Sequence, residues 1–176
     1  MKRWGLYVPL VIFVAVAVLL WRGLSLDPNY MPSALENKPL PAFKLVTLDG
    51  NEVSQVDMTG DIAIVNVWAT WCPSCHVEHA YLNELAARGV IIFGVNYKDD
   101  LPKARQWLAQ RGDPYRFNIA DEEGLFGLDL GVTGAPETYL IDANGVVRLR
   151  YQGPLSERVW QQEFAPRIAK LNGAAG

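Results

Sequence analysis

The sequence predicts one α/β domain in which a central mixed sheet is flanked by helices and preceded by a β-hairpin. Two apolar runs of strand length, residues 62–68 and 90–95, enclose a stretch with helical periodicity. Two further predicted strands, residues 138–141 and 146–151, flank the turn sequence at residues 142–145. The 176 residues suffice for one core once the apolar N-terminus is set aside, so a second domain is not expected.

The N-terminal segment combines positive charge with an uncharged apolar run. Lys2 and Arg3 precede residues 4–21, and Arg22 follows them. A helix of this length, with its flanks, matches a hydrocarbon core of roughly 30 Å. We therefore predict a single-pass anchor over residues 1–24 in the inner membrane, with a cytoplasmic N-terminus and the rest of the chain in the periplasm. A cleaved signal peptide is the alternative, but no small-x-small cleavage site follows the run.

The next segments are assigned from turn residues and periodicity. A proline-rich tether is expected over residues 25–41 and the globular domain over residues 42–173. The hairpin is predicted from strands at residues 43–48 and 52–56 around Asp49-Gly50-Asn51. The other expected elements are helices over residues 73–88, 101–110 and 155–171, a strand over residues 115–119 and a loop-rich segment over residues 121–133. In the first helix the apolar positions that recur at helical spacing are Val77, Ala80, Tyr81, Leu85 and Ala86.

Charge and cysteine content narrow the function. The net charge of -3 argues against a nucleic-acid partner. Cys72 and Cys75 are three positions apart and have no other cysteine to pair with. A disulfide across so short a loop constrains the unfolded chain little, so reactivity explains the pair better than stability does.

The cysteines lie in Trp71-Cys72-Pro73-Ser74-Cys75, where a buried strand passes into a helix. The unpaired N–H groups and positive dipole end of a helix favour a thiolate and lower its pKa. We therefore assign Cys72 as the nucleophile. Cys75, one turn further along and less exposed, is the resolving thiol that attacks the mixed disulfide. No cofactor is expected beyond the redox-active disulfide itself.

Three other interpretations of the pair are weaker. A purely structural disulfide does not explain the position at a helix start. A zinc site from the two cysteines and His79, with His76 adjacent, lacks a second Cys-x-x-Cys or His-x-x-x-His, so no metal is expected and both histidines are placed on the polar helix face. A peroxidase needs a threonine three residues before the reactive cysteine, where this chain has Ala69.

Pro136 and two acids complete the predicted site. Pro136 begins a strand, where its missing N–H is tolerated. A trans turn proline is the ordinary expectation. Together with an upstream Cys-x-x-Cys, a cis proline that faces the cysteines and exposes the backbone of Ala135 to a substrate strand explains the position better. Glu78 and Glu137 are each either a solvated surface carboxylate or a charge that raises the pKa of the nucleophile.

These motifs together resemble the thioredoxin superfamily and, within it, the CcmG/DsbE thiol:disulfide interchange proteins of cytochrome c maturation. The resemblance covers nearly the whole chain and includes the anchor and residues 66–75, 94–100 and 127–138. It implies a thioredoxin fold with an N-terminal β-hairpin and a strand/helix insertion, and activity as a periplasmic protein-disulfide reductase.

The resemblance also implies partners. A DsbD/CcdA-like membrane protein would supply electrons, and the chain would reduce the haem-binding cysteines of apocytochrome c, directly or through a CcmH-like protein. Glu78 and Glu137 match acidic positions that shape reactivity and partner choice. Ser74 departs from the usual threonine, with a small effect expected on the reduction potential. Asn66 stands where general thioredoxins carry a buried aspartate that moves protons, which leaves Glu78 as the candidate for that role.

Two rival functions use the same residues. A general disulfide oxidase or isomerase has the same fold, and the reduction potential separates it from a reductant. A non-catalytic module that only binds apocytochrome predicts that Cys72→Ser keeps full function.

Overall fold

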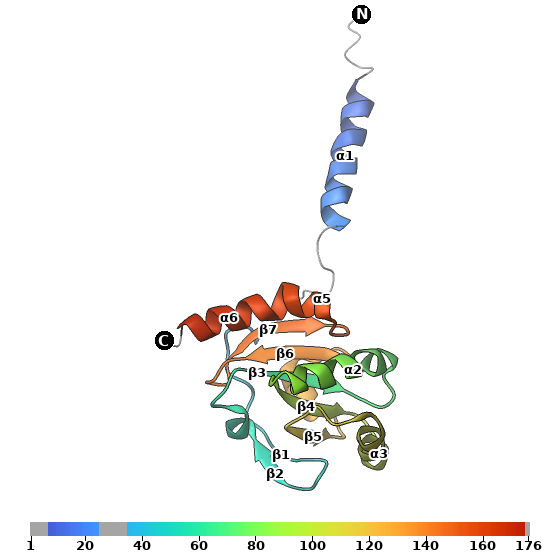
Figure 1. The fold of residues 1–176 in the computed structure, drawn as a ribbon. Helices are drawn as coiled ribbons and strands as arrows, with labels where there is room; N and C mark the ends of the chain where they lie inside the picture. The colour runs from blue at the N-terminus through green and yellow to red at the C-terminus, as the bar shows by residue number, and fades with distance from the viewer. Residues whose placement is uncertain (1–6, 25–34, 175–176) are drawn as a thin grey trace, which may run out of the picture. The chain divides into compact units, whose positions relative to one another are not determined.

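The computed structural model describes residues 7–24 and 35–174, which fall into two units, Met1–Tyr30 and Met31–Gly176 (Figure 1). The first unit contains one helix, α1 (Val8–Leu24), of 17 residues. No helix in the described ranges is long and apolar enough to cross a membrane. The span expected over residues 4–21 begins outside these ranges. The predicted positive flank at Lys2 and Arg3 lies outside the described residues, as do residues 25–34 of the predicted tether.

The second unit is built on a mixed sheet with strand order β5-β4-β3-β6-β7. Parallel pairing joins the first three, which are β3 (Ala63–Trp68), β4 (Ile91–Tyr97) and β5 (Phe117–Asp121). Antiparallel pairing joins β6 (Glu137–Ile141) to β3 and β7 (Val147–Gln152) to β6. Every residue of β3 is buried, as its continuous apolar run predicts for a central strand.

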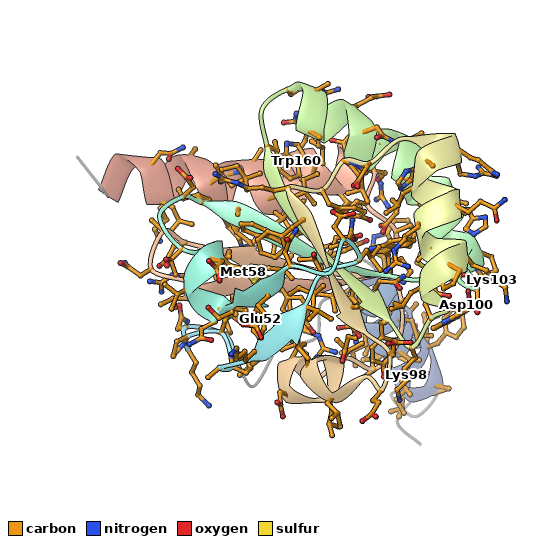
Figure 2. All side chains as sticks on the ribbon, turned by 90° about the horizontal axis from the view of Figure 1, so that it is seen from below. Glu52, Met58, Lys98, Asp100, Lys103 and Trp160 are labelled. Carbon is orange, nitrogen blue, oxygen red and sulfur yellow. A yellow bond between two sulfur atoms is a disulfide. The ribbon has the colours of Figure 1, made fainter. Side chains whose placement is uncertain are left out.

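Alternate residues of the sheet enter two cores, one on each face. Ile64 of β3 points into a core with α2 (Pro73–Ala87), α3 (Leu101–Arg111) and the C-terminal segment. Val65 points into the other core, with α4 (Leu125–Leu130) and the hairpin. Figure 2 labels one residue of each core: Trp160 belongs to the core with α2, and Met58 belongs to the core with α4. The hairpin comprises β1 (Lys44–Val46) and β2 (Glu52–Ser54), and the short 3-10 helix η2 (Gln55–Met58) follows it. The C-terminal segment comprises α5 (Glu157–Val159), η3 (Trp160–Phe164) and α6 (Ala165–Ala174).

Helix α4 lies within the segment predicted as loop, residues 121–133. Its glycines explain the error, because Gly124 and Gly131 suggest a loop but are the two caps of the helix, with left-handed φ of 73° and 74°. Gly127 packs so closely that a Cβ there would lie 2.5 Å from the ring of Tyr97. Strand β5 and helix α4 follow one another in the chain between α3 and β6.

The buried face of α2 also differs from the prediction. Val77 is 75% exposed, and the buried positions are Cys75, Glu78, His79, Leu82 and Leu85. Of the predicted apolar positions, Leu85 is buried and Tyr81 and Ala86 pack against the core, whereas Val77 and Ala80 are exposed. The apolar pattern missed the polar residues of the buried face, where Glu78 and His79 lie together with Cys75.

Candidate active site

The two cysteines form a disulfide at the start of α2. Cys72 is the N-cap residue, and its Sγ accepts a hydrogen bond of 3.1 Å from the backbone N–H of Cys75. Pro73 occupies the first turn, where a backbone N–H has no partner within the helix. A sulfur at this position faces unpaired N–H groups and the positive end of the helix dipole, which stabilise a negative charge on Cys72.

The pair is covered in this disulfide form. Cys72 is 1% exposed and Cys75 is 2% exposed, so the predicted difference in exposure between them is not seen. The N-cap position accounts for this, because it turns the sulfur of Cys72 back onto the helix. Pro73, Ser74 and Trp71 are exposed around the pair, and Trp71 is 52% exposed. These three residues are the exposed surface next to the covered pair.

Pro136 lies at the end of the sheet where β3 leads to the cysteines, although it is far from them in the sequence. Glu137, the first residue of β6, pairs with Val67 near the end of β3, which leads to the cysteines. The Ala135–Pro136 peptide bond is cis. Ala135 packs against the core cluster that contains both cysteines. The structure thus brings the predicted proline segment and cysteine segment together.

Glu78 is a buried acid, which excludes the surface alternative. Its side chain is 1% exposed, and its two carboxylate oxygens accept hydrogen bonds from the side-chain amide of Asn66 at 2.9 Å and the backbone N–H of Leu155 at 2.7 Å. Burial outweighs these bonds and raises the pKa of Glu78 to about 7. A carboxyl with this pKa exchanges protons near neutral pH.

Asn66 joins Glu78 to a wider buried network. Its Oδ1 accepts a 2.9 Å bond from the hydroxyl of Tyr115, and its Nδ2 also donates to Thr138 Oγ1 at 3.1 Å. Burial, followed by the nearby charge of Glu78, raises the pKa of Tyr115 well above its ordinary value, so Tyr115 is a donor. Tyr115 was not predicted as a site residue, because it is 49 positions from Asn66 and no local motif connects them.

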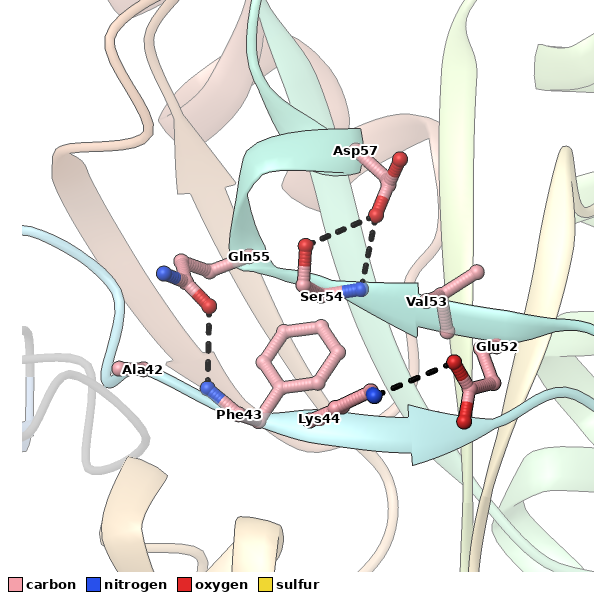
Figure 3. A pocket seen from close by; sticks show the side chains of 8 residues that line it. All are labelled: Ala42, Phe43, Lys44, Glu52, Val53, Ser54, Gln55 and Asp57. Carbon is pink, nitrogen blue, oxygen red and sulfur yellow. Dashed lines mark hydrogen bonds and ion pairs between the residues drawn. The ribbon is translucent and has the colours of Figure 1, made fainter.

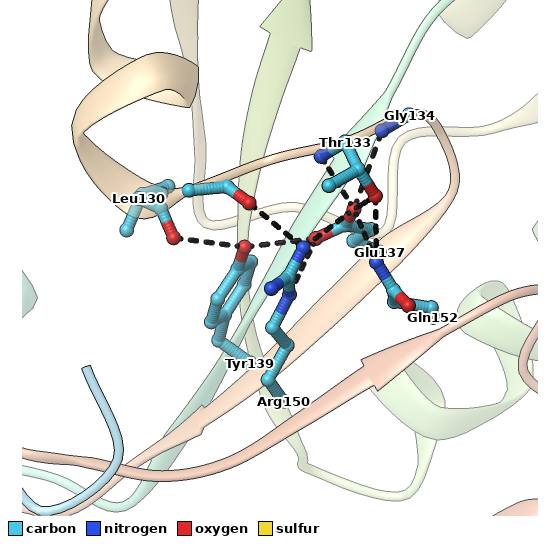
Figure 4. Close-up of polar contacts among 8 residues, drawn as sticks. Leu130, Thr133, Gly134, Glu137, Tyr139, Arg150 and Gln152 are labelled. Carbon is cyan, nitrogen blue, oxygen red and sulfur yellow. Dashed lines mark hydrogen bonds and ion pairs between the residues drawn. The ribbon is translucent and has the colours of Figure 1, made fainter. Parts of the chain in front are cut away.

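Glu137 is also buried, and its charge is balanced by Arg150. The guanidinium binds both carboxylate oxygens, at 2.9 and 3.0 Å, and the N–H and hydroxyl of Thr133 and the hydroxyl of Tyr139 add further bonds (Figure 4). Burial opposes ionisation, but these donors hold the pKa of Glu137 below its ordinary value. These bonds tie the loop that leads to Pro136 to the sheet. Arg150 lies on the adjacent strand β7, 13 positions after Glu137, and no sequence motif marked it as the partner of this acid.

The two histidines of α2 have different environments. His76 is exposed, as predicted, and its Nε2 lies 2.9 Å from the carbonyl oxygen of Thr70. His79 is 3% exposed, so its predicted place on the polar face is wrong. Its ring packs 4.1 Å from that of Trp107, and its Nε2 lies 2.9 Å from the carbonyl oxygen of Gly112. Residues 7–24 and 35–174 contain no group of three or more His, Cys, Asp or Glu that could hold a metal ion.

A cavity of about 550 Å³ lies elsewhere in the domain. It is formed by β1, β2 and η2, and its lining includes the ion pair between Lys44 and Glu52 (Figure 3). None of the predicted site residues lines it. The cysteine site is therefore separate from this cavity.

A cysteine pair at the start of a helix that follows the central strand of a mixed sheet is typical of a thiol:disulfide oxidoreductase with a thioredoxin-like fold. The Redoxin family model matches residues 35–164. Curated relatives share this sequence over nearly its whole length. The protein from Pseudomonas fluorescens biotype C called thiol:disulfide interchange protein DsbE is 54% identical over 172 residues, which is 97% of each chain. The Escherichia coli K12 protein of the same name is 49% identical over 183 residues, or 99% of each chain.

The chain therefore belongs to the Redoxin family and, within it, to the DsbE thiol:disulfide interchange proteins. Solved structures agree. A Chlorobium tepidum protein described as DsbE has a TM-score of 0.65 at 29% identity and covers 74% of this chain and 96% of its own. A thioredoxin-like protein from Neisseria meningitidis has a TM-score of 0.64 at 25% identity and covers 77% and 92%.

Proposed function

We propose that the chain is a periplasmic reductant in cytochrome c biogenesis. It would reduce the disulfide formed by the haem-binding Cys-x-x-Cys-His cysteines of apocytochrome c, directly or through a CcmH-like thiol protein. A DsbD/CcdA-like membrane protein would return the chain to its dithiol form. Attachment to the inner membrane through residues 1–24 stays a sequence prediction, and it is checked by whether the chain sediments with membranes after a carbonate wash.

The reaction proceeds through two exchange steps. The Cys72 thiolate attacks one sulfur of the partner disulfide, which forms a mixed disulfide and releases the partner's other sulfur as a thiolate that takes up a proton. Cys75 then loses its proton and attacks Cys72 Sγ, which forms the observed disulfide and releases the partner's second thiol. Glu78, on the same buried face as Cys75, is the candidate acceptor for the Cys75 proton.

The burial of Glu78 is the observation that supports a reductant over an oxidase. Strong oxidases stabilise their reduced thiolate form. Here the nearby buried acid already disfavours its own ionised form, and a thiolate close to it adds a second negative charge to a poorly solvated region. Because the reduced form gains less stabilisation, the disulfide is favoured and the dithiol gives up its electrons more readily.

The test is the equilibrium reduction potential of the full chain in mild detergent, titrated against glutathione and measured by alkylation of the cysteines. We expect a value of about -200 mV or lower, and a value near about -120 mV would identify an oxidase and overturn the proposal. Cys75→Ser, which lacks the resolving thiol, should trap a mixed disulfide with an oxidised Cys-x-x-Cys-His peptide. If Cys72→Ser supports normal cytochrome c maturation in cells, the chain is only a binding module.

A further inference from the structure

The loop that precedes Cys72 is attached at two consecutive residues to the loop between β4 and α3. The backbone N–H and the hydroxyl of Thr70 donate to Oδ2 and Oδ1 of Asp99, each at 2.6 Å. The indole N–H of Trp71 donates to the carbonyl oxygen of Lys98 at 2.9 Å. These bonds fix the two residues immediately before the nucleophile, and none of them involves the cysteines.

Asp99 is itself held in one orientation. Its Oδ2 also accepts a 2.9 Å bond from Nδ2 of Asn96, which is 0% exposed. The Oδ1 atom of Asn96 has no hydrogen-bond partner among the residues that the structure describes. A buried acceptor without a partner is unfavourable, but a rotated amide would direct this oxygen at the Asp99 carboxylate. The Asn96 side chain is therefore oriented to support Asp99.

The neighbouring backbone is also constrained. Lys98 has a φ of 49°, in the left-handed region that residues with a side chain rarely adopt. This conformation accompanies the bond between its carbonyl oxygen and Trp71. A strained residue at an attachment point between two loops indicates that the position of Trp71 is specified by the fold.

We infer that Asp99 is a positioning residue for disulfide exchange with a polypeptide, and that it acts by holding Trp71 beside the buried sulfur of Cys72. The ring of Trp71 is 52% exposed, so it offers apolar area to a partner while its N–H is fixed. An extended chain that carries the target disulfide contacts this ring as well as the sulfur, whereas a small disulfide needs only the sulfur. The inference rests on the proposed function and concerns the same site.

The test compares Asp99→Asn with Asp100→Asn in the full chain. Both variants remove one negative charge, from adjacent positions. An amide at residue 99 offers one acceptor oxygen where the carboxylate offers two, so at least one bond from Thr70 is lost. Asp100 instead caps α3 through a 2.9 Å bond from the N–H of Lys103, a role that asparagine also fills.

The measured quantities are the rate constants of the reduced chain with an oxidised Cys-x-x-Cys-His peptide and with glutathione disulfide. Asp99→Asn should lower the peptide rate at least fivefold and the glutathione rate less than twofold, while Asp100→Asn changes neither. An equal loss with both substrates, or no difference between the two variants, overturns the inference.

Trp71→Phe provides a second test, which remains informative if Asp99→Asn does not fold. It keeps an aromatic ring but removes the N–H that binds Lys98, so it should show the same selective loss for the peptide. Equal rates of this variant and the wild type with the peptide would contradict the inference.

A peptide disulfide unrelated to haem sites distinguishes the two proposals. Equal wild-type rates with both peptides count against the proposed function, whereas the comparison of the variants tests the inference with either peptide.

Discussion

The carboxylate of Glu78 and the backbone N–H of Leu155 are joined by a 2.7 Å hydrogen bond across 77 residues of sequence. The bond connects the helix that carries the cysteines to the loop between β7 and α5. Both residues are buried, with exposures of 1% and 2%. The ionisation of Glu78 therefore affects the stability of the fold as well as the chemistry of the site.

Stability should decrease with rising pH because of Glu78. Burial raises its pKa from 4.5 to about 7, so the unfolded chain loses this proton at a lower pH than the folded chain. The contribution of Glu78 to the free energy of unfolding is fully present when the pH is below the pKa of Glu78 in the unfolded chain. It falls by on the order of 3 kcal/mol as the pH rises to the pKa in the folded chain, and it does not change further above that pH. Glu78→Gln removes this decrease, which urea unfolding of the oxidised chain between pH 5 and pH 8 measures.

The control is the difference in unfolding free energy between the wild type and Glu78→Gln at each pH. Burial lowers the pKa of His79, which therefore stabilises the fold above its unfolded pKa and loses that contribution as pH falls. This opposite effect is present in both chains and cancels in the difference. A difference in unfolding free energy that stays constant from pH 5 to pH 8 would show that Glu78 ionises normally.

Glu78→Gln should also slow the second exchange step. If Glu78 accepts the proton of Cys75, the variant resolves a preformed mixed disulfide about 10-fold more slowly or worse, as expected for loss of a general base. Rapid-quench measurement of partner release gives this rate. Glu84→Gln is the control, because Glu84 lies on the same helix but is exposed and bonded to Arg88. Unchanged exchange and unchanged titration of Cys72 in Glu78→Gln exclude the proposed role.

Arg150→Met should destabilise the domain by about 3 kcal/mol or more, because it leaves the charge of Glu137 buried without its cation. The matched variant is Arg148→Met on the same strand, where the arginine is more exposed and pairs with Asp142. We expect a cost of about 1 kcal/mol or less there. Equal losses in denaturant unfolding would contradict the assignment of Glu137 and Arg150 as a buried pair.

The acid dependence of the same variant gives an independent check. In the wild type the lowered pKa of Glu137 contributes stability that is present above its unfolded pKa and lost as pH falls. Arg150→Met removes the main donor and so raises this pKa. The stability of the variant should therefore approach that of the wild type when the pH is lowered to about 4, where protonation of Glu137 relieves the unpaired charge.

Gly94→Ala tests how closely β4 packs against the side chain of Asn118, which binds Trp68 of β3. A Cβ at Gly94 would lie 1.9 Å from Oδ1 of Asn118, the atom that accepts the indole N–H of Trp68 at 2.8 Å. We expect a loss of about 2 kcal/mol or more from overpacking and from the broken bond. In Gly134→Ala the added Cβ meets no described atom within 4 Å, so stability should change by about 0.5 kcal/mol or less. Similar unfolding midpoints for the two variants would contradict this packing.

The elements that the sequence predicted well are those with a local signal. Strand β3 follows from one apolar run, and the cysteine pair follows from its position at a helix start. The polar network was not predictable, because Asn66 and Tyr115 meet only after β3 and the segment before β5 have been assembled. Glu78 did have a usable signal, since it falls on one helical stripe with Cys75 and Leu82, but its charge suggested the surface.

The burial of Cys72 and Cys75 in the disulfide form has a further consequence for their reaction with small thiols. With exposures of 1% and 2%, the two sulfurs offer almost no surface to a dissolved thiol. A dissolved thiol should therefore reduce this disulfide slowly as long as the start of α2 stays in place. The same cover separates the pair from unrelated thiols and disulfides, so the oxidised cysteines are kinetically protected from them.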